Sequence, residues 1–193
     1  MSGDTWVRAR RSGDLAACAE ALRAVHHADG YPTNWPQDPV GWLRGGDVVG
    51  AWVGCHGERV VGHVLLTRPD PGDVAPTLAP ADTPVAVVGR LFVAPSARGH
   101  RLGAALLGRA AREARRHGAL AVLDVVATDS AAIALYERLG WRFLAQGQQE
   151  WGPGELVTVR CYSAPPEDWP REAGRPRRRR GGHPQGRPRH RAR

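Results

Sequence analysis

Lysine is absent from this chain of 193 residues, so all 27 of its basic residues are arginine. Glycine and proline are frequent, with 24 and 16 copies. We interpret this combination as a composition bias of the genome rather than as a functional choice. The arginine content alone therefore does not identify a nucleic-acid-binding protein.

Cysteine clusters and long apolar runs are also missing. The three cysteines, Cys18, Cys55 and Cys161, have neither the spacing of a metal site nor that of a disulfide framework. This pattern suits a reducing cytosol. No apolar stretch approaches the length of a transmembrane helix, and no signal peptide opens the sequence. We therefore expect a cytoplasmic protein that involves no membrane and holds no metal.

The C-terminal segment lacks the large aliphatic residues of a core. Residues 165–193 contain no Leu, Ile, Val or Phe, and ten arginines stand against three acidic residues, so they carry +7 of the net charge of +8. Such a segment cannot bury apolar surface. We expect a folded domain over residues 1–164 and a disordered Arg/Pro/Gly-rich tail over residues 165–193. A basic tail can bind nucleic acid weakly, but we favour a solubilising extension.

The folded part is organised around the stretch from Val85 to Gly118. Val85–Val93 is an apolar run typical of a buried strand, and Pro95 ends it. A helical pattern begins at Arg101. The turn between them brings glycines and arginines to a helix N-terminus, whose free N–H groups suit a phosphate. The sequence has neither a Gly-Lys-Ser/Thr phosphate loop nor a Gly-x-Gly-x-x-Gly dinucleotide motif, and glycines at a helix start also serve packing.

Hydrophobic periodicity predicts the other elements. Asp14 is the expected N-cap of the first helix, and Thr128 or Asp129 that of the last one. A Gly/Gln/Pro-rich loop is expected to join the last two strands. The predicted order is β-α-α-β-β-β-α-β-α-β-β, with strands at residues 6–10, 47–55, 59–67, 85–93, 119–127, 141–145 and 156–162.

Two motifs carry a family resemblance. The string LFVAPSARGHRLGAALL resembles the coenzyme A-binding motif of the GNAT superfamily of acetyl-CoA-dependent N-acetyltransferases, Leu-x-Val-x-Pro followed by Arg/Gln-x-x-Gly-x-Gly/Ala. Arg98 and Gly103 take the Arg/Gln and second glycine positions, and Arg101 replaces the first glycine. The string DSAAIALYERLGWRF resembles the family segment Asn-x-x-Ala-x-x-Leu-Tyr-Glu-x-x-Gly-Phe, with Asp129 and Trp141 in place of Asn and Phe.

The resemblance spans residues 5–163 and implies a fold and an activity. The implied GNAT fold is α/β (α+β), with a mixed, mostly antiparallel twisted sheet of about seven strands, a V-shaped splay between the fourth and fifth strands, and about four flanking helices. The implied activity is transfer of an acetyl group from acetyl-CoA, as co-substrate, to a primary amine by direct attack. The pantetheine arm would lie between the strands at residues 85–93 and 119–127.

The resemblance also implies residue roles. Tyr136 matches the tyrosine that protonates the leaving thiolate. Periodicity alone would make Tyr136 a core aromatic with a satisfied hydroxyl. An N–H of the central strand would stabilise the thioester oxygen as the amine attacks. The residues expected to bind the cofactor lie on the central strand, in the turn and at the last helix cap: Leu91, Phe92, Val93, Arg98, Gly99, His100, Arg101, Leu102, Gly103, Ala104 and Asp129.

The sequence leaves the general base and the acceptor open. Many relatives place a glutamate on the central strand, but residues 85–90 contain no carboxylate. The candidates are His26, His27, Asp29, Asp47 and His63, with a water chain as the alternative. The resemblance implies an acceptor wall that consists of Tyr31, Trp35, Trp42 and the stretch Gln146–Glu155 with Trp151. An equal interpretation is that Trp35 and Trp42 pack the helices onto the sheet.

The sequence shows no acidic cluster of the kind that a polycationic acceptor needs. A small-molecule amine, an amino acid and a protein N-terminus all remain possible acceptors. A monomer and a homodimer are both compatible with it. A function of a different class is a non-catalytic acyl-CoA-binding module whose basic tail reaches nucleic acid or a protein partner. Tyr136 favours the enzyme.

Overall fold

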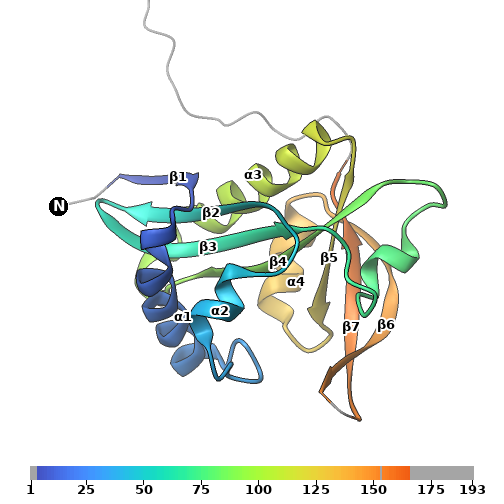
Figure 1. Cartoon of the computed structure of the whole chain (residues 1–193), viewed down its shortest axis with the longest axis horizontal. Coiled ribbons are helices and arrows are strands. Elements are labelled where there is room, and N and C mark those ends of the chain that lie inside the picture. The colour runs from blue at the N-terminus through green and yellow to red at the C-terminus, as the bar shows by residue number, and fades with distance from the viewer. Residues whose placement is uncertain (1–3, 153, 166–193) are drawn as a thin grey trace, which may run out of the picture.

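The computed structural model describes residues 4–152 and 154–165, drawn in colour in Figure 1. The predicted tail lies outside these residues, except for Pro165. The element order is the predicted one. The strands are β1 (Thr5–Ala9), β2 (Val48–His56), β3 (Arg59–Thr67), β4 (Val85–Val93), β5 (Leu120–Val126), β6 (Arg142–Gly152) and β7 (Glu155–Ser163), and the helices are α1 (Leu15–Asp29), α2 (Pro39–Arg44), α3 (Leu102–Arg116) and α4 (Ser130–Arg138). Short 3₁₀ turns lie at Ser12–Asp14, Ala75–Leu78 and Pro95–Ala97.

The strands form one mixed sheet of seven in the order β1-β2-β3-β4-β5-β7-β6. Every neighbouring pair is antiparallel except β4 with β5. This parallel pair consists only of Val85–Leu120, Ala86–Ala121 and Val87–Val122. Beyond these pairs the two strands run apart (Figure 1), while β5 stays paired with β7. The predicted sheet with its splay between the fourth and fifth strands is therefore confirmed.

A bulge in β4 lies beside the splay. Between the pairs His63–Phe92 and Leu65–Gly89, β4 contains one residue more than β3, and Arg90 takes a φ of +52°. A bulge bends its strand and increases the local twist, so β4 turns away from β5 at this point. Gly89 and Arg90 are the residues that interrupt the apolar run of this strand in the sequence.

Helices cover both faces of the sheet. α1 packs on β3 and β4, and α3 packs across the strands from β1 to β5. Gly62 on β3 faces α3, because a Cβ there would lie 3.2 Å from Leu106. Its neighbour His63 points to the opposite face, as alternation along a strand requires, and stacks on Phe92 at 5.6 Å between ring centroids. No helix among the described residues is long and apolar enough to cross a membrane.

The last hairpin corrects one local prediction. β6 continues to Gly152, so most of the segment predicted as a loop is strand. It pairs with β7 from Arg142–Ser163 to Gly152–Glu155. The polar residues of this segment have a low strand propensity, but cross-strand pairing with β7 overrides it.

The start of α1 corrects the prediction that Asp14 caps this helix. Asp14 occupies the N-cap position, but its carboxylate makes no capping hydrogen bond to the helix. It accepts hydrogen bonds of 2.5 and 2.7 Å from the guanidinium of Arg8 and one of 2.6 Å from the N–H of Arg11. A charged partner gives a stronger hydrogen bond than a neutral backbone group, so the ion pair with β1 replaces the cap.

Candidate active site

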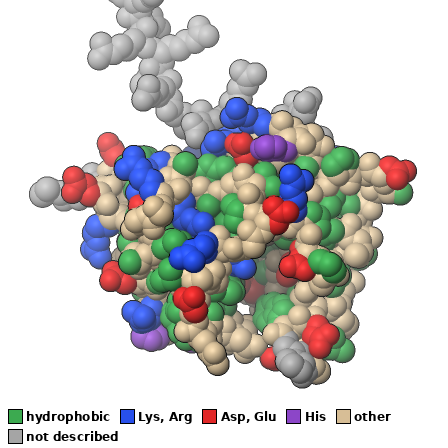
Figure 2. All heavy atoms as spheres, viewed as in Figure 1, with side chains coloured by type: hydrophobic (Ala, Val, Ile, Leu, Met, Phe, Trp, Pro, Cys, Tyr) green, Lys and Arg blue, Asp and Glu red, His purple; other side chains and the backbone are tan. Residues whose placement is uncertain are grey.

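A cleft of about 1770 Å³ follows the splay between β4 and β5 and extends past the end of α1 and α2 to β6. Figure 2 shows this face of the molecule hollowed, with hydrophobic side chains in the hollow and acidic side chains around it. The cleft brings most of the predicted cofactor residues together. Its lining includes Leu91, Phe92, Val93, Arg98, Gly99, Arg101, Leu102, Gly103, Ala104 and Asp129, together with Tyr136, but not His100.

The N-terminus of α3 opens into this cleft without a side-chain cap. Arg101 is the N-cap residue, makes no capping hydrogen bond and takes a φ of +58°. Glycine adopts this conformation without steric cost, which explains the glycine of the family motif at this position. A Cβ on Gly103 would lie 3.5 Å from Leu135 and 3.8 Å from Val93, which are ordinary contacts. Packing within the chain does not require this glycine, and the exposed N–H groups fit an approaching phosphate.

Two side chains of the turn are engaged within the protein. Arg98 forms an ion pair with Asp29 at the end of α1, with 3.1 Å between Nη1 and Oδ1, and its Nε donates to the carbonyl of Val93 at 3.3 Å. The guanidinium lowers the pKa of Asp29. His100 stacks on His56 at 5.6 Å between ring centroids. Arg98 therefore ties α1 to the turn, and His100 lies outside the cleft.

Tyr136 reaches the cleft from α4. Its side chain is 7% exposed and packs against the rings of Trp141 and Tyr162, at 6.2 and 5.9 Å between centroids. The hydroxyl has no hydrogen-bond partner among the described residues. Burial raises the pKa of Tyr136 well above its ordinary value. A buried aromatic of purely structural role would have a satisfied hydroxyl, so the arrangement favours a hydroxyl that faces a ligand.

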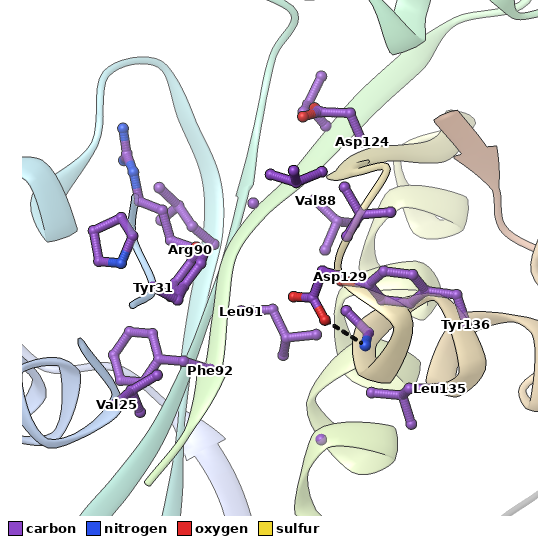
Figure 3. Close-up of a pocket in the computed structure, with 18 of the residues that line it drawn as sticks. Val25, Tyr31, Val88, Arg90, Leu91, Phe92, Asp124, Asp129, Leu135 and Tyr136 are labelled. Carbon is purple, nitrogen blue, oxygen red and sulfur yellow. Dashed lines mark hydrogen bonds between the residues drawn. The ribbon is translucent and has the colours of Figure 1, made fainter. Parts of the chain in front are cut away.

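Asp129 is the N-cap residue of α4 and is one of the two residues predicted for this role. Its carboxylate accepts a hydrogen bond of 2.9 Å from the N–H of Ala132, drawn as a dashed line in Figure 3. The capping bond orients the first turn of α4 against the cleft. The replacement of the motif asparagine by aspartate therefore keeps the capping function.

Asp124 is a cleft carboxylate that the sequence reasoning missed. It lies on β5, half-buried, and Figure 3 shows it on the same side of β4 as Asp129 and Tyr136. Burial raises the pKa of Asp124 above its ordinary value. A signal was present, because Asp124 is the one charged residue in the apolar run of β5. A lone carboxylate with a perturbed pKa in a cleft is a candidate for chemistry.

His63, one of the candidate bases, is a buried structural residue. It does not line the cleft, and its side chain is fully buried. Its Nδ1 lies 3.0 Å from the carbonyl oxygen of Arg90, and its Nε2 lies 2.9 Å from the guanidinium of Arg10. An arginine only donates, so Nε2 accepts and Nδ1 donates. Burial lowers the pKa of His63 from 6.5 to about 4, which keeps the ring neutral at pH 7.

The other candidate bases are no better placed. His26 and His27 do not line the cleft. Asp29 lines it but is paired with the arginine of the turn. Asp47 lies at the exposed rim, with its Oδ2 3.4 Å from the Nε of Arg68.

The far end of the cleft is lined by aromatic side chains and by the acidic residues Asp70, Asp73 and Glu150. Tyr31 and Trp42 line it and meet edge to face at 6.4 Å between centroids. Trp151 lines it from β6, as expected for the acceptor wall. Trp35 does not, and packs on His26 at 5.0 Å between centroids.

Several solved structures are similar to this chain in fold. A putative acetyltransferase from Salmonella typhimurium, yncA, with its cofactor acetyl-CoA, has a TM-score of 0.58 and 22% identity over 82% of this chain and 92% of that one. The ribosomal-protein-S18-alanine N-acetyltransferase from Escherichia coli has a TM-score of 0.61 and 17% identity over 84% and 94%. Arabidopsis thaliana NAA60 in complex with acetyl-CoA has a TM-score of 0.63 and 18% identity over 83% and 97%.

The sequence itself matches a family model. No curated protein sequence gives a significant match. The model of the acetyltransferase (GNAT) family, in contrast, matches residues 18–141, from α1 to the residue before β6. This segment is more than half of the chain and contains the turn before α3, Asp124 and Tyr136. The chain therefore belongs to the acetyltransferase (GNAT) family.

Proposed function

We propose that this protein is an acetyl-CoA-dependent N-acetyltransferase that acts on a primary amine. The observation that carries the proposal is the splay between β4 and β5. It opens an unpaired edge of β4 between the uncapped start of α3 and two side chains that can carry protons, Asp124 and Tyr136.

The chain offers two kinds of backbone contact to the cofactor. Acetyl-CoA supplies the acetyl group as a thioester. The free N–H groups of the first turn of α3, with the positive end of the helix dipole, suit its pyrophosphate. The edge of β4 that faces the splay has no strand partner beyond Val87 and suits the peptide-like pantetheine arm. An N–H in the stretch from Leu91 to Val93 would stabilise charge on the thioester oxygen.

The two side chains divide the proton transfers. A new C–N bond forms as the C–S bond breaks, so the amine loses a proton and the thiolate gains one. Asp124 takes the proton of the amine, because its raised pKa makes it a better base than an exposed aspartate. Tyr136 gives its proton to the thiolate, because it stays protonated at neutral pH until the thiolate forms. Exchange with water restores both side chains.

Turnover with acetyl-CoA and a panel of primary amines tests this function. We expect release of free thiol that depends on the amine, together with the acetylated amine in the mass spectrum. A protein that binds acetyl-CoA but acetylates no amine would instead support the non-catalytic acyl-CoA-binding module.

A further inference from the structure

Arg90 lies at the far end of the cleft, on the bulge of β4. Its φ of +52° is unusual for a long side chain and costs free energy. The hydrogen bond from His63 to its carbonyl, supported by Arg10, holds the bulge from behind. Its side chain extends over the ring of Trp42, with 5.0 Å between the guanidinium carbon and the ring centroid. The fold thus maintains this position of the guanidinium against backbone strain.

The guanidinium of Arg90 has no direct ion-pair partner among the described residues. Among the described residues no carboxylate lies within ion-pair distance of it, and its Nη1 is buried without a hydrogen-bond partner. Burial lowers the pKa of Arg90, and Arg10 adds a second positive charge nearby. A buried cation without a partner is unfavourable. An anion from outside the chain would remove this cost.

The other arginines of the cleft do not share this situation. Arg98 is paired with Asp29, and Arg68 with Asp47. Arg101 and Arg138 also line the cleft, but both are exposed, so water solvates their charge. Among the arginines that line the cleft, Arg90 alone is therefore half-buried without an ion-pair partner among the described residues.

The opposite wall carries the complementary charge. Figure 3 shows Arg90 and Tyr31 on one side of β4 and Asp124 with Tyr136 on the other. Asp73, in the loop after β3, also lines this end and interacts electrostatically with both Arg90 and Asp124. A simple amine would satisfy only the carboxylates. An amine that also bears a carboxylate satisfies both walls.

We propose that the acceptor carries a carboxylate close to its amino group, as an α-amino acid does, and that Arg90 binds this carboxylate while the amine faces Asp124. This inference rests on the proposed function and narrows its substrate class. A guanidinium binds a carboxylate through two parallel hydrogen bonds, and Arg90 lines the cleft without an ion-pair partner among the described residues. Trp42 and Tyr31 line the space beside it, which suits an apolar or aromatic side chain.

Matched acceptors test the proposal in the unmodified protein. The panel consists of L-amino acids such as L-leucine and L-phenylalanine, each with its carboxamide and its decarboxylated amine. We expect kcat/KM for the amino acid to exceed that for its carboxamide by roughly 10- to 100-fold. Amine reactivity alone predicts the reverse order, because the amine of the carboxamide loses its proton more readily. Equal or faster turnover of the carboxamides would overturn the proposal.

Three variants locate the effect. Arg90→Leu should remove the preference for the carboxylate, chiefly through KM, so that kcat/KM for the amino acid no longer exceeds that for its carboxamide. The matched control is Arg68→Leu, which removes a positive charge from the exposed rim of the same cleft and should leave the preference intact. Arg90→Lys should restore part of it. The melting temperature separates a structural role, because Arg90→Leu removes an unpaired buried charge and should not lower it below that of Arg68→Leu.

Ligand binding distinguishes failure of this inference from failure of the proposed function. If no amine is acetylated, an L-amino acid should still raise the melting temperature of the wild-type protein and not that of Arg90→Leu. That result would contradict the enzymatic function and support the carboxylate site. Acetylation of amines with an equal loss for acids and carboxamides in Arg90→Leu would keep the function and contradict the carboxylate site.

Discussion

Burial acts on two residues of the cleft with opposite chemical results. For Tyr136 it raises the pKa of a group that is already protonated at neutral pH, so the hydroxyl remains a donor. For Asp124 it raises the pKa of a group that is ionised at neutral pH, so the carboxylate becomes a stronger base. Burial thus strengthens Asp124 as a base, whereas Tyr136 is a proton donor by its ordinary chemistry and becomes a weaker acid on burial.

Tyr136→Phe tests the acid. The ring still packs against Trp141 and Tyr162, so the fold and acetyl-CoA binding should be kept. Turnover should fall by roughly 10²–10⁴-fold, nearer the low end because a thiol is a good leaving group. Tyr162→Phe is the control, since it removes a buried hydroxyl that bonds Glu137 at 3.1 Å and does not line the cleft. Wild-type turnover in Tyr136→Phe would contradict the acid role.

Asp124→Asn tests the base. A base must be deprotonated, so kcat/KM should fall as the pH drops through the raised pKa of Asp124, with the acid limb above the ordinary value near 3.8. The variant should lose this limb and roughly 10²–10⁴-fold of kcat. It should not be less stable, because the ionised carboxylate is disfavoured by burial. Asp129→Asn is the control, since asparagine also caps a helix. An unchanged pH profile in Asp124→Asn would exclude Asp124 as the base.

His63 should make stability depend on pH. Its pKa is lowered from 6.5 to about 4 in the folded protein, so between these values the unfolded chain binds the additional proton. Its contribution to the free energy of unfolding is complete above pH 6.5 and is lost as the pH falls toward 4. The loss between pH 7 and pH 5 should be about 2 kcal/mol, measured by urea unfolding.

The comparison that isolates His63 uses two variants. His63→Gln should flatten this pH dependence, whereas His27→Gln, at an exposed histidine, should keep it. The same slope in His63→Gln and in the wild type would show that other groups cause the effect.

Residue roles followed from the sequence only where a motif carried them. Tyr136 stands in a long matching string, so its place in the cleft was predicted. Asp124 and Arg90 stand in apolar strands without a motif, and their significance depends on the splay and on the bulge. These features arise from pairing between strands far apart in the sequence, which a local pattern does not encode.

At the scale of elements, the turn before α3 shows how a motif residue can change while its backbone does not. The family glycine is replaced by Arg101, yet the position keeps the left-handed φ that glycine favours. The chain therefore retains the geometry of the motif at the cost of strain and gains a cation at the start of a helix that is expected to bind phosphate.

Arg101→Gly and Arg101→Ala separate these two effects. The glycine variant should relieve about 1 kcal/mol of strain and raise the melting temperature by roughly 2–4 °C. The alanine variant keeps the strain and should show no such rise. Both lose the guanidinium, so both should bind acetyl-CoA several-fold more weakly, by calorimetry at low salt. Equal melting temperatures of the two variants would show that Arg101 is not strained.

The order and type of the main elements were predictable, because strands such as Val85–Val93 and helices such as α3 have strong periodicity. The second half of β6 was not, because its glutamines and glycines carry no strand signal and only pairing with β7 defines it. The ion pair of Asp14 likewise depends on Arg8 in β1, so local capping rules could not reveal it.

At the scale of the whole molecule, charge is divided unevenly. The tail carries +7, so the other 164 residues carry only +1 of the +8. Near the end of the described residues, the N–H of Ala164 donates a hydrogen bond of 2.8 Å to the carbonyl of Ala121. Every described residue that lines the cleft precedes Ala164.

Truncation after Pro165 should therefore remove the positive charge of the tail without affecting the folded domain. The free energy of unfolding should change by less than about 0.5 kcal/mol, and the acetyl-CoA affinity should be unchanged. Any binding of the full chain to DNA or heparin should be salt-sensitive and should disappear. Unfolding of the truncated protein would place the domain boundary further along the chain.

The brevity of the contact between β4 and β5 has a consequence for the free protein. Within the described part of the sheet, three backbone residue pairs connect strands β1–β4 to strands β5–β7, and both α3 and the 3₁₀ turn Ala75–Leu78 pack against both groups of strands. A cofactor bound in the splay would contact both groups of strands and so add to the few backbone pairs between them. Because a ligand that binds only the folded state stabilises it by about 2.7 kcal/mol at 100 times its Kd, we expect the supply of acetyl-CoA to set the lifetime of the protein as well as its rate.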